Sequence, residues 1–468
     1  MDSADEPVSP AFDIDGFLNE RPIVPVQWAI LGLCFLVMMT DGFHTAAMAF
    51  VAPALMADLA ISKLTLGPIL AAALVGLALG AFAAGPLADR FGRKRILVVS
   101  VLICSVGSIL TTGAWNASTL MACRFLTGLG IGAAMPNCTT LASEFIPARR
   151  RDLVLNLMFC GFPLGASSSG FLTAWVVPHY GWRGVFLAGG VFPILLAVFL
   201  SRMPESISFM VVRRYPAQKI KTALLRIAGS DTQACGTILA ANEFGILEQL
   251  VARTKAPWQV ILSRDYLPGT LMLWLSYFMG LVLYYLVTSW MPILVRETGY
   301  SIGKAATASA LFPLGGGVGA LLCGWLMGRM NPTRVVSGAY LLTALLLLVL
   351  ARSTGTFGAL ITATLFAGIA MNGAQSSMPA LAAASYPTFG RASGVAWMLA
   401  TGRIGGIIGA FGGGVLLNAG YSLRQIISSL SLVALVSALA LAGKDLANRR
   451  RATRTVIHAE FPVRSSIE

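Results

Sequence analysis

Apolar residues gather in long segments along this chain, and short polar stretches separate them. A helix needs roughly 20 predominantly apolar residues to cross a bilayer. By that measure the first six spans are expected near 27–57, 66–88, 94–113, 117–145, 153–177 and 182–202. Six more are expected near 266–295, 303–329, 333–351, 356–385, 391–417 and 422–443. The pattern predicts an all-α integral membrane protein with twelve transmembrane helices.

Three longer segments lie outside these spans. Residues 1–26 form an acidic, polar tail that lacks the basic start of a cleaved signal peptide, so it is expected to stay attached. Residues 203–262 mix charged and apolar positions and are expected to form a connecting loop with short amphipathic helices. Residues 444–468 form a basic tail. The expected organisation is one six-helix half at 27–202 and another at 263–443.

Composition and the placement of charge indicate the surroundings of the chain. Hydrophobic residues make up 56% of the 468 residues and charged residues only 12%, which excludes an ordinary soluble protein. A net charge of +14 would suggest nucleic acid as the partner of a soluble protein. Here the basic residues lie on one side, at 89–95, 148–152 and 328–334, in the connecting loop and in the C-terminal tail. The positive-inside rule makes that side cytoplasmic. We expect both termini inside a bacterial inner membrane, with the lipid bilayer as partner and no nucleic acid.

Several kinds of chemistry find no support in the sequence. The seven cysteines fall mostly in apolar segments without CxxC or Cys/His spacing, so no metal is expected. Glycine strings at 128–132 and 315–319 sit inside apolar spans, where they favour close helix packing over nucleotide binding. No Walker sequence, nucleophile triad or cofactor motif occurs. The chain is not expected to be an enzyme, and an ion gradient is the expected energy source.

The two sets of six spans resemble each other weakly. A shift of 240 residues aligns five pairs of identical residues, Gly128 with Gly368, Leu141 with Leu381, Pro147 with Pro387, Arg151 with Arg391 and Gly165 with Gly405. Glycine is abundant enough for chance matches, but the loops EFIPARRR and SYPTFGR also correspond. Many transporters consist of two such halves. We therefore interpret the halves as an internal duplication.

Two ionisable side chains interrupt the first apolar span. Asp41 and His44 lie three residues apart in LVMMTDGFHTAAMAFVAPAL, so a helix places both on one face. An ionisable group near the bilayer centre costs about 2.5–3.5 kcal/mol, so such groups usually face a cavity or a partner. The pair either takes part in function or binds another helix, and we favour function.

The loop between the second and third spans carries the most specific local motif, GPLADRFGRKR at 85–95. It resembles the G-x-x-x-D-R-x-G-R-[KR]-[KR] signature of the major facilitator superfamily. The residues that carry the resemblance as a gating motif are Gly85, Asp89, Arg90, Gly92 and Arg93. Gly85 is expected to permit close helix approach, and Asp89 to cap a helix or pair with an arginine across the halves as a gate latch. A solvated basic turn that sets topology is an alternative, and both can hold.

The second half repeats this motif only in part. In GWLMGRMNPTR, Gly328 stands where the acid would be, so the latch is expected to be weaker or one-sided there. Arg391, in the loop that matches ARRRD, is expected to serve the gate or the topology and not to bind a ligand.

Longer segments resemble the aromatic acid:proton symporters within that superfamily, above all 4-hydroxybenzoate and protocatechuate transporters. The segments are DGFHTAAMAFVAPAL, RFLTGLGIGAAMPNCTTLASEF, FCGFPLGASSSGF, WLSYFMGLVLYYLVTSWMP and NGAQSSMPALAAASYPTFGRASGVAWMLATGRIGG, and the resemblance covers nearly all twelve spans. It implies uptake of a benzoate-type anion together with protons. The family's first span usually reads D-G-x-D, whereas this chain has His44 at the last position. Histidine exchanges protons near neutral pH but is no fixed negative charge, which puts the proton stoichiometry in question.

A carboxylate that crosses the membrane needs a cation, and arginine matches it best. Arg403 lies about 12 residues into its span and so about 18 Å deep, near the middle of the bilayer core. Arg124 lies nearer the periplasmic end of the fourth span. Arg124 is alternatively a permanent partner of Asp41, and Arg403 a donor to carbonyls beside glycines. Glu144, near the cytoplasmic end of the fourth span, is expected either to form a structural salt bridge or to release protons.

Aromatic and amide side chains complete the predicted substrate pocket, since such pockets combine apolar walls with a few polar groups. The aromatic candidates for stacking on a benzene ring are Phe43, Tyr277, Tyr284, Tyr285, Trp290 and Trp397. Each of them alternatively packs in the core or against lipid. Asn372 and Gln375 are expected to bond ring hydroxyls, because amides are costly in a span.

These observations together predict a proton-coupled symporter for a small aromatic carboxylate. Asp41 is expected to carry the proton, Arg403 to anchor the carboxylate, and Arg124 and His44 to tune the proton site, while the halves rock to alternate access. Protons are the only expected coupling ion, without a cofactor, and a monomer is expected to function. The superfamily signature alone also allows a proton-driven efflux antiporter, and a sensor that binds aromatic acids without moving them is a further alternative.

Overall fold

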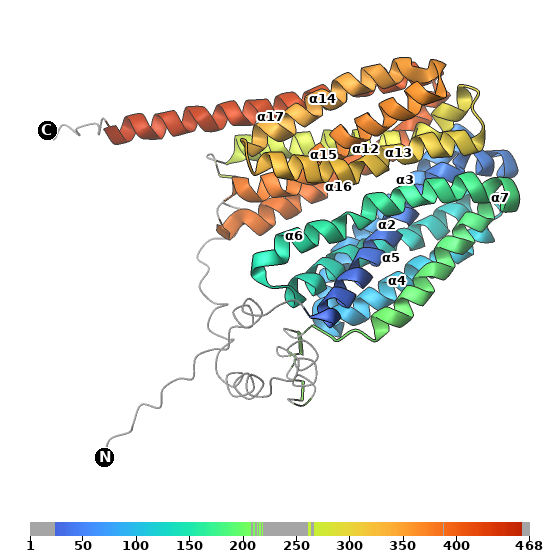
Figure 1. The fold of residues 1–468 in the computed structure, drawn as a ribbon, viewed down its shortest axis with the longest axis horizontal. Coiled ribbons are helices and arrows are strands. Elements are labelled where there is room, and N and C mark those ends of the chain that lie inside the picture. The colour runs from blue at the N-terminus through green and yellow to red at the C-terminus, as the bar shows by residue number, and fades with distance from the viewer. Residues whose placement is uncertain are drawn as a thin grey trace. The chain divides into compact units, whose positions relative to one another are not determined.

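The computed structural model describes residues 24–206, 209–210, 213, 215–216, 218, 261–263, 266–386 and 388–460. Most of the predicted N-terminal tail and of the predicted connecting loop lies outside these residues. Within them, every element of regular structure is a helix (Figure 1). The helices of the first half are α2 (Pro25–Leu59), α3 (Lys63–Phe91), α4 (Arg93–Thr112), α5 (Ala117–Phe145), α6 (Ala148–Phe159) and α7 (Gly161–Ser201). Those of the second are α12 (Leu267–Glu297), α13 (Ile302–Met327), α14 (Pro332–Arg352), η1 (Ser353–Gly355), α15 (Phe357–Ser385), α16 (Thr388–Asn418) and α17 (Leu423–Glu460).

The described residues contain 11 helical segments long and apolar enough to cross a membrane, and one of them is long enough to cross twice. That segment, Val154–Ser201, has 48 residues. At 1.5 Å per residue it would span about 72 Å, more than twice the roughly 30 Å of a bilayer core. Gly181 breaks it, because a φ of 70° and a ψ of 176° are incompatible with a helix. The described residues therefore provide twelve transmembrane helices, as predicted.

Two helix boundaries differ from the prediction by five residues or more. The fifth span was expected to begin at 153, whereas α6 already begins at Ala148 and gives way to α7 at Cys160. The last span was expected to end at 443, whereas α17 continues to Glu460. Its basic extension contains no proline, and its only glycine is Gly443, so nothing in its backbone ends the helix at the membrane surface.

Some helix contacts also repeat at an interval of 240 residues. A Cβ atom at Gly165 would overlap the carbonyl group of Met39, and one at Gly405 would lie 2.5 Å from the carbonyl oxygen of Phe278. In each half a glycine, at positions 240 residues apart, thus lets a later helix touch the first helix of that half. Contacts at the predicted cytoplasmic end repeat as well. The Glu205 carboxylate accepts a hydrogen bond from the backbone of Lys94 (2.9 Å), and Arg334 pairs with Asp445 (3.2 Å), both residues again 240 positions further on.

The chain forms two compact units whose limits cut across the predicted halves. One consists of residues 1–45, 75–165 and 186–254, and the other of 46–74, 166–185 and 255–468. In the first unit, glycines bring α3 and α5 into backbone contact, since side chains at Gly76 and Gly132 would overlap Phe125 and Leu77. The division into halves at 27–202 and 263–443 remains a prediction.

The second unit contains direct contacts between the two sets of six helices. Lys63 at the start of α3 forms an ion pair with Glu297 at the end of α12. A Cβ atom at Gly67 would lie 2.9 Å from the carbonyl oxygen of Phe411 on α16. Ser167 on α7 donates a hydrogen bond to the Ala310 carbonyl on α13 (2.9 Å). The two sets of helices therefore touch at the ends predicted to face the periplasm.

Replacing Gly67 by leucine is expected to separate the helices at these ends. The new side chain has no room beside Phe411, and overpacking costs about 1–3 kcal/mol, which lowers the population of the closed arrangement about 5- to 150-fold. Spin labels at the exposed positions Ser62 and Tyr421 should then move apart in double electron–electron resonance. Gly412→Leu is the control, because a Cβ there meets no heavy atom of the described residues within 4 Å. Equal label distances in both variants would contradict the expectation.

Candidate functional site

Asp41 and His44 lie on one buried face of α2, as the spacing predicts. Only 4% of Asp41 and 0% of His44 are exposed. The Thr45 hydroxyl, one turn further along, donates to Asp41 Oδ1 at 3.4 Å. Two ionisable groups thus sit in adjacent positions inside the first unit, away from water.

The His44 ring joins α2 to α7. Its Nε2 lies 3.0 Å from the carbonyl oxygen of Gly189, and a neutral imidazole that carries its proton on Nε2 donates this bond. Gly189 leaves space for the approach, because a Cβ there would lie 2.6 Å from the ring of Phe43 and 3.1 Å from that of His44. The other ring nitrogen, Nδ1, is buried and has no hydrogen-bond partner among the described residues. His44 therefore acts as a tether between helices and keeps one nitrogen free.

Arg124 on α5 reaches the same turn of α2. Its Nη2 donates to the backbone carbonyl of His44 at 2.6 Å, and its guanidinium carbon lies 5.5 Å from the centre of the Phe186 ring. The residue is only 1% exposed, and its Nε and Nη1 have no hydrogen-bond partner within the described part of the chain. A buried guanidinium with unused donors beside His44, three residues after Asp41, is suited to respond to a change of charge there.

Arg403 and Tyr277 form a second group, in the other unit. The Tyr277 ring lies over Gly402 on α16, where a Cβ atom would overlap it. Arg403 follows Gly402 directly in the sequence, and the Tyr277 hydroxyl lies near it. Arg403 itself is half-buried, whereas Tyr277 is 8% exposed. This part of α12 and α16 thus presents a cation and a phenol ring together.

The two amide side chains of α15, Asn372 and Gln375, differ in the hydrogen bonds that their NH2 groups donate. Asn372 Nδ2 donates to the carbonyls of Phe312 (3.2 Å) and Gly368 (2.9 Å), so both of its N–H groups serve helix contacts. Gln375 Oε1 accepts a hydrogen bond from the Tyr340 hydroxyl at 2.6 Å, while Nε2 finds no partner among the described residues. Of the two predicted ligands, Gln375 keeps free donors and Asn372 does not.

The aromatic residues predicted to line the substrate pocket differ in burial and in the groups that they contact. Trp290 is 0% exposed, donates from Nε1 to the Ala410 carbonyl at 2.7 Å and packs against glycines of α16, so the structure gives it a packing role instead of a ligand face. Tyr284 contacts Tyr285 edge-on, with ring centroids 5.2 Å apart. Trp397 is 45% exposed and stacks on Trp274 at 5.8 Å.

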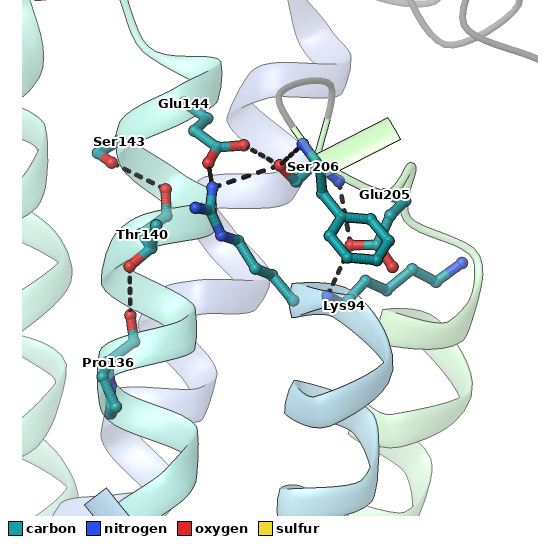
Figure 2. Close-up of polar contacts among 9 residues, drawn as sticks. Lys94, Pro136, Thr140, Ser143, Glu144, Glu205 and Ser206 are labelled. Atoms are coloured by element: carbon teal, nitrogen blue, oxygen red, sulfur yellow. Dashed lines mark hydrogen bonds and ion pairs between the residues drawn. The ribbon is translucent and has the colours of Figure 1, made fainter. Parts of the chain in front are cut away.

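Glu144 forms a polar cluster at the predicted cytoplasmic end of α5 (Figure 2). Its carboxylate forms an ion pair with Arg93 of the signature motif and accepts a hydrogen bond from the Ser206 hydroxyl. Figure 2 shows Glu205 beside Lys94, at the start of α4. The negative charge of its carboxylate is stabilised there by the positive end of the helix dipole. Of the two roles predicted for Glu144, the contacts favour the structural salt bridge.

The glycines of the signature motif play unequal parts. Gly92 has a φ of 103°, which favours glycine, and a Cβ there would lie 2.6 Å from a carboxylate oxygen of Glu205. A Cβ at Gly85 would meet no heavy atom of the described residues within 4 Å, so the close helix approach expected there is absent from this conformation. Asp89, Arg90 and Arg391 are exposed, and the backbone carbonyl of Asp89 accepts a bond from Arg213 at 2.9 Å.

Glu205, Ser206 and Tyr340 are among the residues of these clusters that were not predicted from the sequence. Glu205 and Ser206 fall in the expected connecting loop, and their signal was the acid directly after a span. Tyr340 lies in the middle of an apolar span, where a single tyrosine carries no signal of its partner.

Comparisons with known proteins agree on one family. A family profile described as Major Facilitator Superfamily matches residues 33–312 and 273–465. The 4-hydroxybenzoate transporter PcaK of Pseudomonas aeruginosa is 44% identical over 95% of this chain and 98% of its own length. The gallate transporter of Pseudomonas putida is 44% identical over 96% of this chain and 98% of its own length.

The likeness extends to solved structures. The xylose transporter XylE from E. coli, in a partially occluded inward-open conformation, aligns with a TM-score of 0.69. The alignment covers 90% of this chain and 97% of that chain at 18% identity. At this identity the similarity establishes the fold alone.

Exchanging Glu144 for glutamine is expected to destabilise the protein through loss of the Arg93 pair. The two side chains are only 15% and 23% exposed, so the free energy of unfolding should fall by about 1–3 kcal/mol. Melting temperatures in detergent of E144Q, R93Q and the double variant would measure the effect. The double variant should melt close to the single ones. Simple addition of the two losses would show that Arg93 and Glu144 do not act as a pair.

Proposed function

Because this chain belongs to the major facilitator superfamily and to its aromatic acid transporters, we propose that it takes up a small aromatic carboxylate together with protons. The observation that carries the proposal is the 44% identity to the 4-hydroxybenzoate transporter PcaK along 95% of the chain. The similar identity to a gallate transporter points to hydroxylated benzoates as the substrate class. The protein is a multi-pass membrane transporter and not an enzyme. An inner-membrane location, cytoplasmic termini and function as a monomer belong to the proposal.

Asp41 is the proposed proton carrier. A carboxyl group that is 4% exposed inside a membrane helix is costly when charged, and protonation removes that cost. His44 and Arg124 are proposed to tune it, since the Arg124 guanidinium is bound to the His44 carbonyl on the next turn. His44 donates to the Gly189 carbonyl when neutral, so it is proposed to tune the site by holding α2 in place. Asp41 alone is the proposed carrier of the proton.

Arg403 is the proposed anchor of the substrate carboxylate. Its guanidinium is half-buried and supplies up to five donors in a plane, which suits a carboxylate. The Tyr277 ring beside it offers an aromatic face for the benzene ring of the substrate. Glu144, by its ion pair with Arg93, is proposed to stabilise the predicted cytoplasmic end of the first half.

Binding of substrate and proton is proposed to favour closure of the side predicted to face the periplasm. The ion pair of Lys63 with Glu297 and the contact of Gly67 with Phe411 belong to that closed arrangement. A carrier with a charged Asp41 and no substrate must bury that charge when it closes, which is costlier than burying the neutral acid. Its reorientation is therefore slow, and proton and substrate move together.

Uptake into proteoliposomes tests the proposal. Labelled 4-hydroxybenzoate, protocatechuate and benzoate would be offered with and without an imposed inward proton gradient. Accumulation that an uncoupler abolishes supports symport. Accumulation only when an outward proton gradient drives it, with protons leaving as the substrate enters, would indicate a proton antiporter and hence efflux. Binding of the substrate without counterflow would indicate a sensor.

Asp41→Asn is expected to abolish accumulation driven by the proton gradient. The amide cannot release a proton, so uptake should stop at the external concentration while exchange of internal for external substrate persists. Asp58→Asn is the matched control, because Asp58 ends the same helix and instead accepts bonds from Trp182 and Arg183 at 2.9 and 2.7 Å. Concentrative uptake by the Asp41 variant would rule out its role as proton carrier.

A further inference from the structure

We propose that Tyr340 is a positioning residue that orients the Gln375 amide toward the ring hydroxyl of the substrate. The inference rests on the proposed function, since it takes a hydroxylated aromatic acid as the ligand. It assigns hydroxyl recognition to three helices of one unit, α12, α14 and α15.

Tyr340 fixes which end of the Gln375 amide is available. Its side chain is 0% exposed, and its hydroxyl donates to Gln375 Oε1 at 2.6 Å. An amide whose oxygen is held in this way keeps its NH2 group on the other side. Because a buried tyrosine has few rotamers, the orientation of Gln375 is held firmly.

Gly280 on α12 makes room for this pair. A Cβ atom at Gly280 would overlap Gln375 Oε1, and it would lie 2.5 Å from the Tyr340 hydroxyl. The hydrogen-bonded pair therefore lies directly against the backbone of α12. Tyr277, whose hydroxyl lies near Arg403 and Gln375, is three residues before Gly280.

The Gln375 NH2 group is buried next to the Tyr277 hydroxyl, yet it forms no hydrogen bond of full geometry within the described residues. The residue is 9% exposed, and Nε2 has no hydrogen bond to any described residue. An unsatisfied buried donor costs about 1–3 kcal/mol, a cost that a bound acceptor removes. Asn372, one turn earlier on α15, shows the contrast, because both of its N–H groups bind backbone carbonyls.

A ring hydroxyl is the acceptor that fits best. The substrate carboxylate is better bound by a charged guanidinium, and Arg403 supplies one beside Tyr277. The remaining acceptor on a hydroxybenzoate is the hydroxyl oxygen, which accepts from Nε2 and keeps its own proton to donate. Benzoate has no such oxygen and leaves the Gln375 donors unpaired. A site built this way discriminates against the analogue that lacks the hydroxyl.

Tyr340→Phe tests the inference with a change of one oxygen atom. Affinities of the purified full-length protein for 4-hydroxybenzoate and for benzoate would be measured by calorimetry in detergent. The wild type should prefer 4-hydroxybenzoate. In the variant that affinity should fall about 3- to 10-fold, the equivalent of one hydrogen bond, while the affinity for benzoate stays unchanged. A purely structural role of Tyr340 would lower both affinities by the same factor.

Gly280→Ala provides a second variant that should remove the same preference, because its methyl group displaces the Tyr340–Gln375 pair. Gly338→Ala on α14 is its control, since a Cβ there meets no described heavy atom within 4 Å. An unchanged ratio of the two affinities in both Tyr340→Phe and Gly280→Ala overturns the inference, as does a wild type without preference. A wild type that binds neither acid overturns the proposed function itself.

Discussion

The cost of polar groups inside an apolar solvent shapes this protein most. Each deep ionisable group or amide needs a partner, and backbone carbonyls of neighbouring helices supply many of them. Arg124 donates to the His44 carbonyl, His44 to that of Gly189 and Asn372 to that of Phe312. Glycines bring the helices close enough for such bonds. Groups left with unused hydrogens, such as the Gln375 amide, are then the natural places for a ligand.

The contacts fall into two classes with different consequences for transport. The ion pair of Arg93 with Glu144 lies within the first six helices, so a movement of these helices as a body does not require it to break. The ion pair of Lys63 with Glu297 joins the first six helices to the last six, so any opening at that end must break it. Both of its side chains are 37% exposed, and exposed pairs contribute only about 0–1 kcal/mol. Such a weak latch suits a contact that forms and breaks in each cycle.

The sequence predicted the helices and the buried face of Asp41 and His44, because hydrophobic period and helix spacing determine them. It did not predict which polar groups satisfy each other. Asn372 and Gln375 look alike as amides in one span, yet helix packing uses the hydrogens of one and leaves those of the other free. Trp290 and Trp397 likewise differ only in where the neighbouring helices lie. Tyr340 and Glu205 gain their roles from partners 35 and 111 residues away, which no local pattern contains.

The coupling of proton to substrate is the central claim, and proton movement driven by the substrate alone tests it most directly. Proteoliposomes with an internal pH-sensitive dye and no imposed proton gradient would receive external 4-hydroxybenzoate. The account predicts that the interior acidifies as the substrate enters, and that the Asp41→Asn variant gives no such signal. Entry of labelled 4-hydroxybenzoate without acidification beyond that of protein-free vesicles would contradict it.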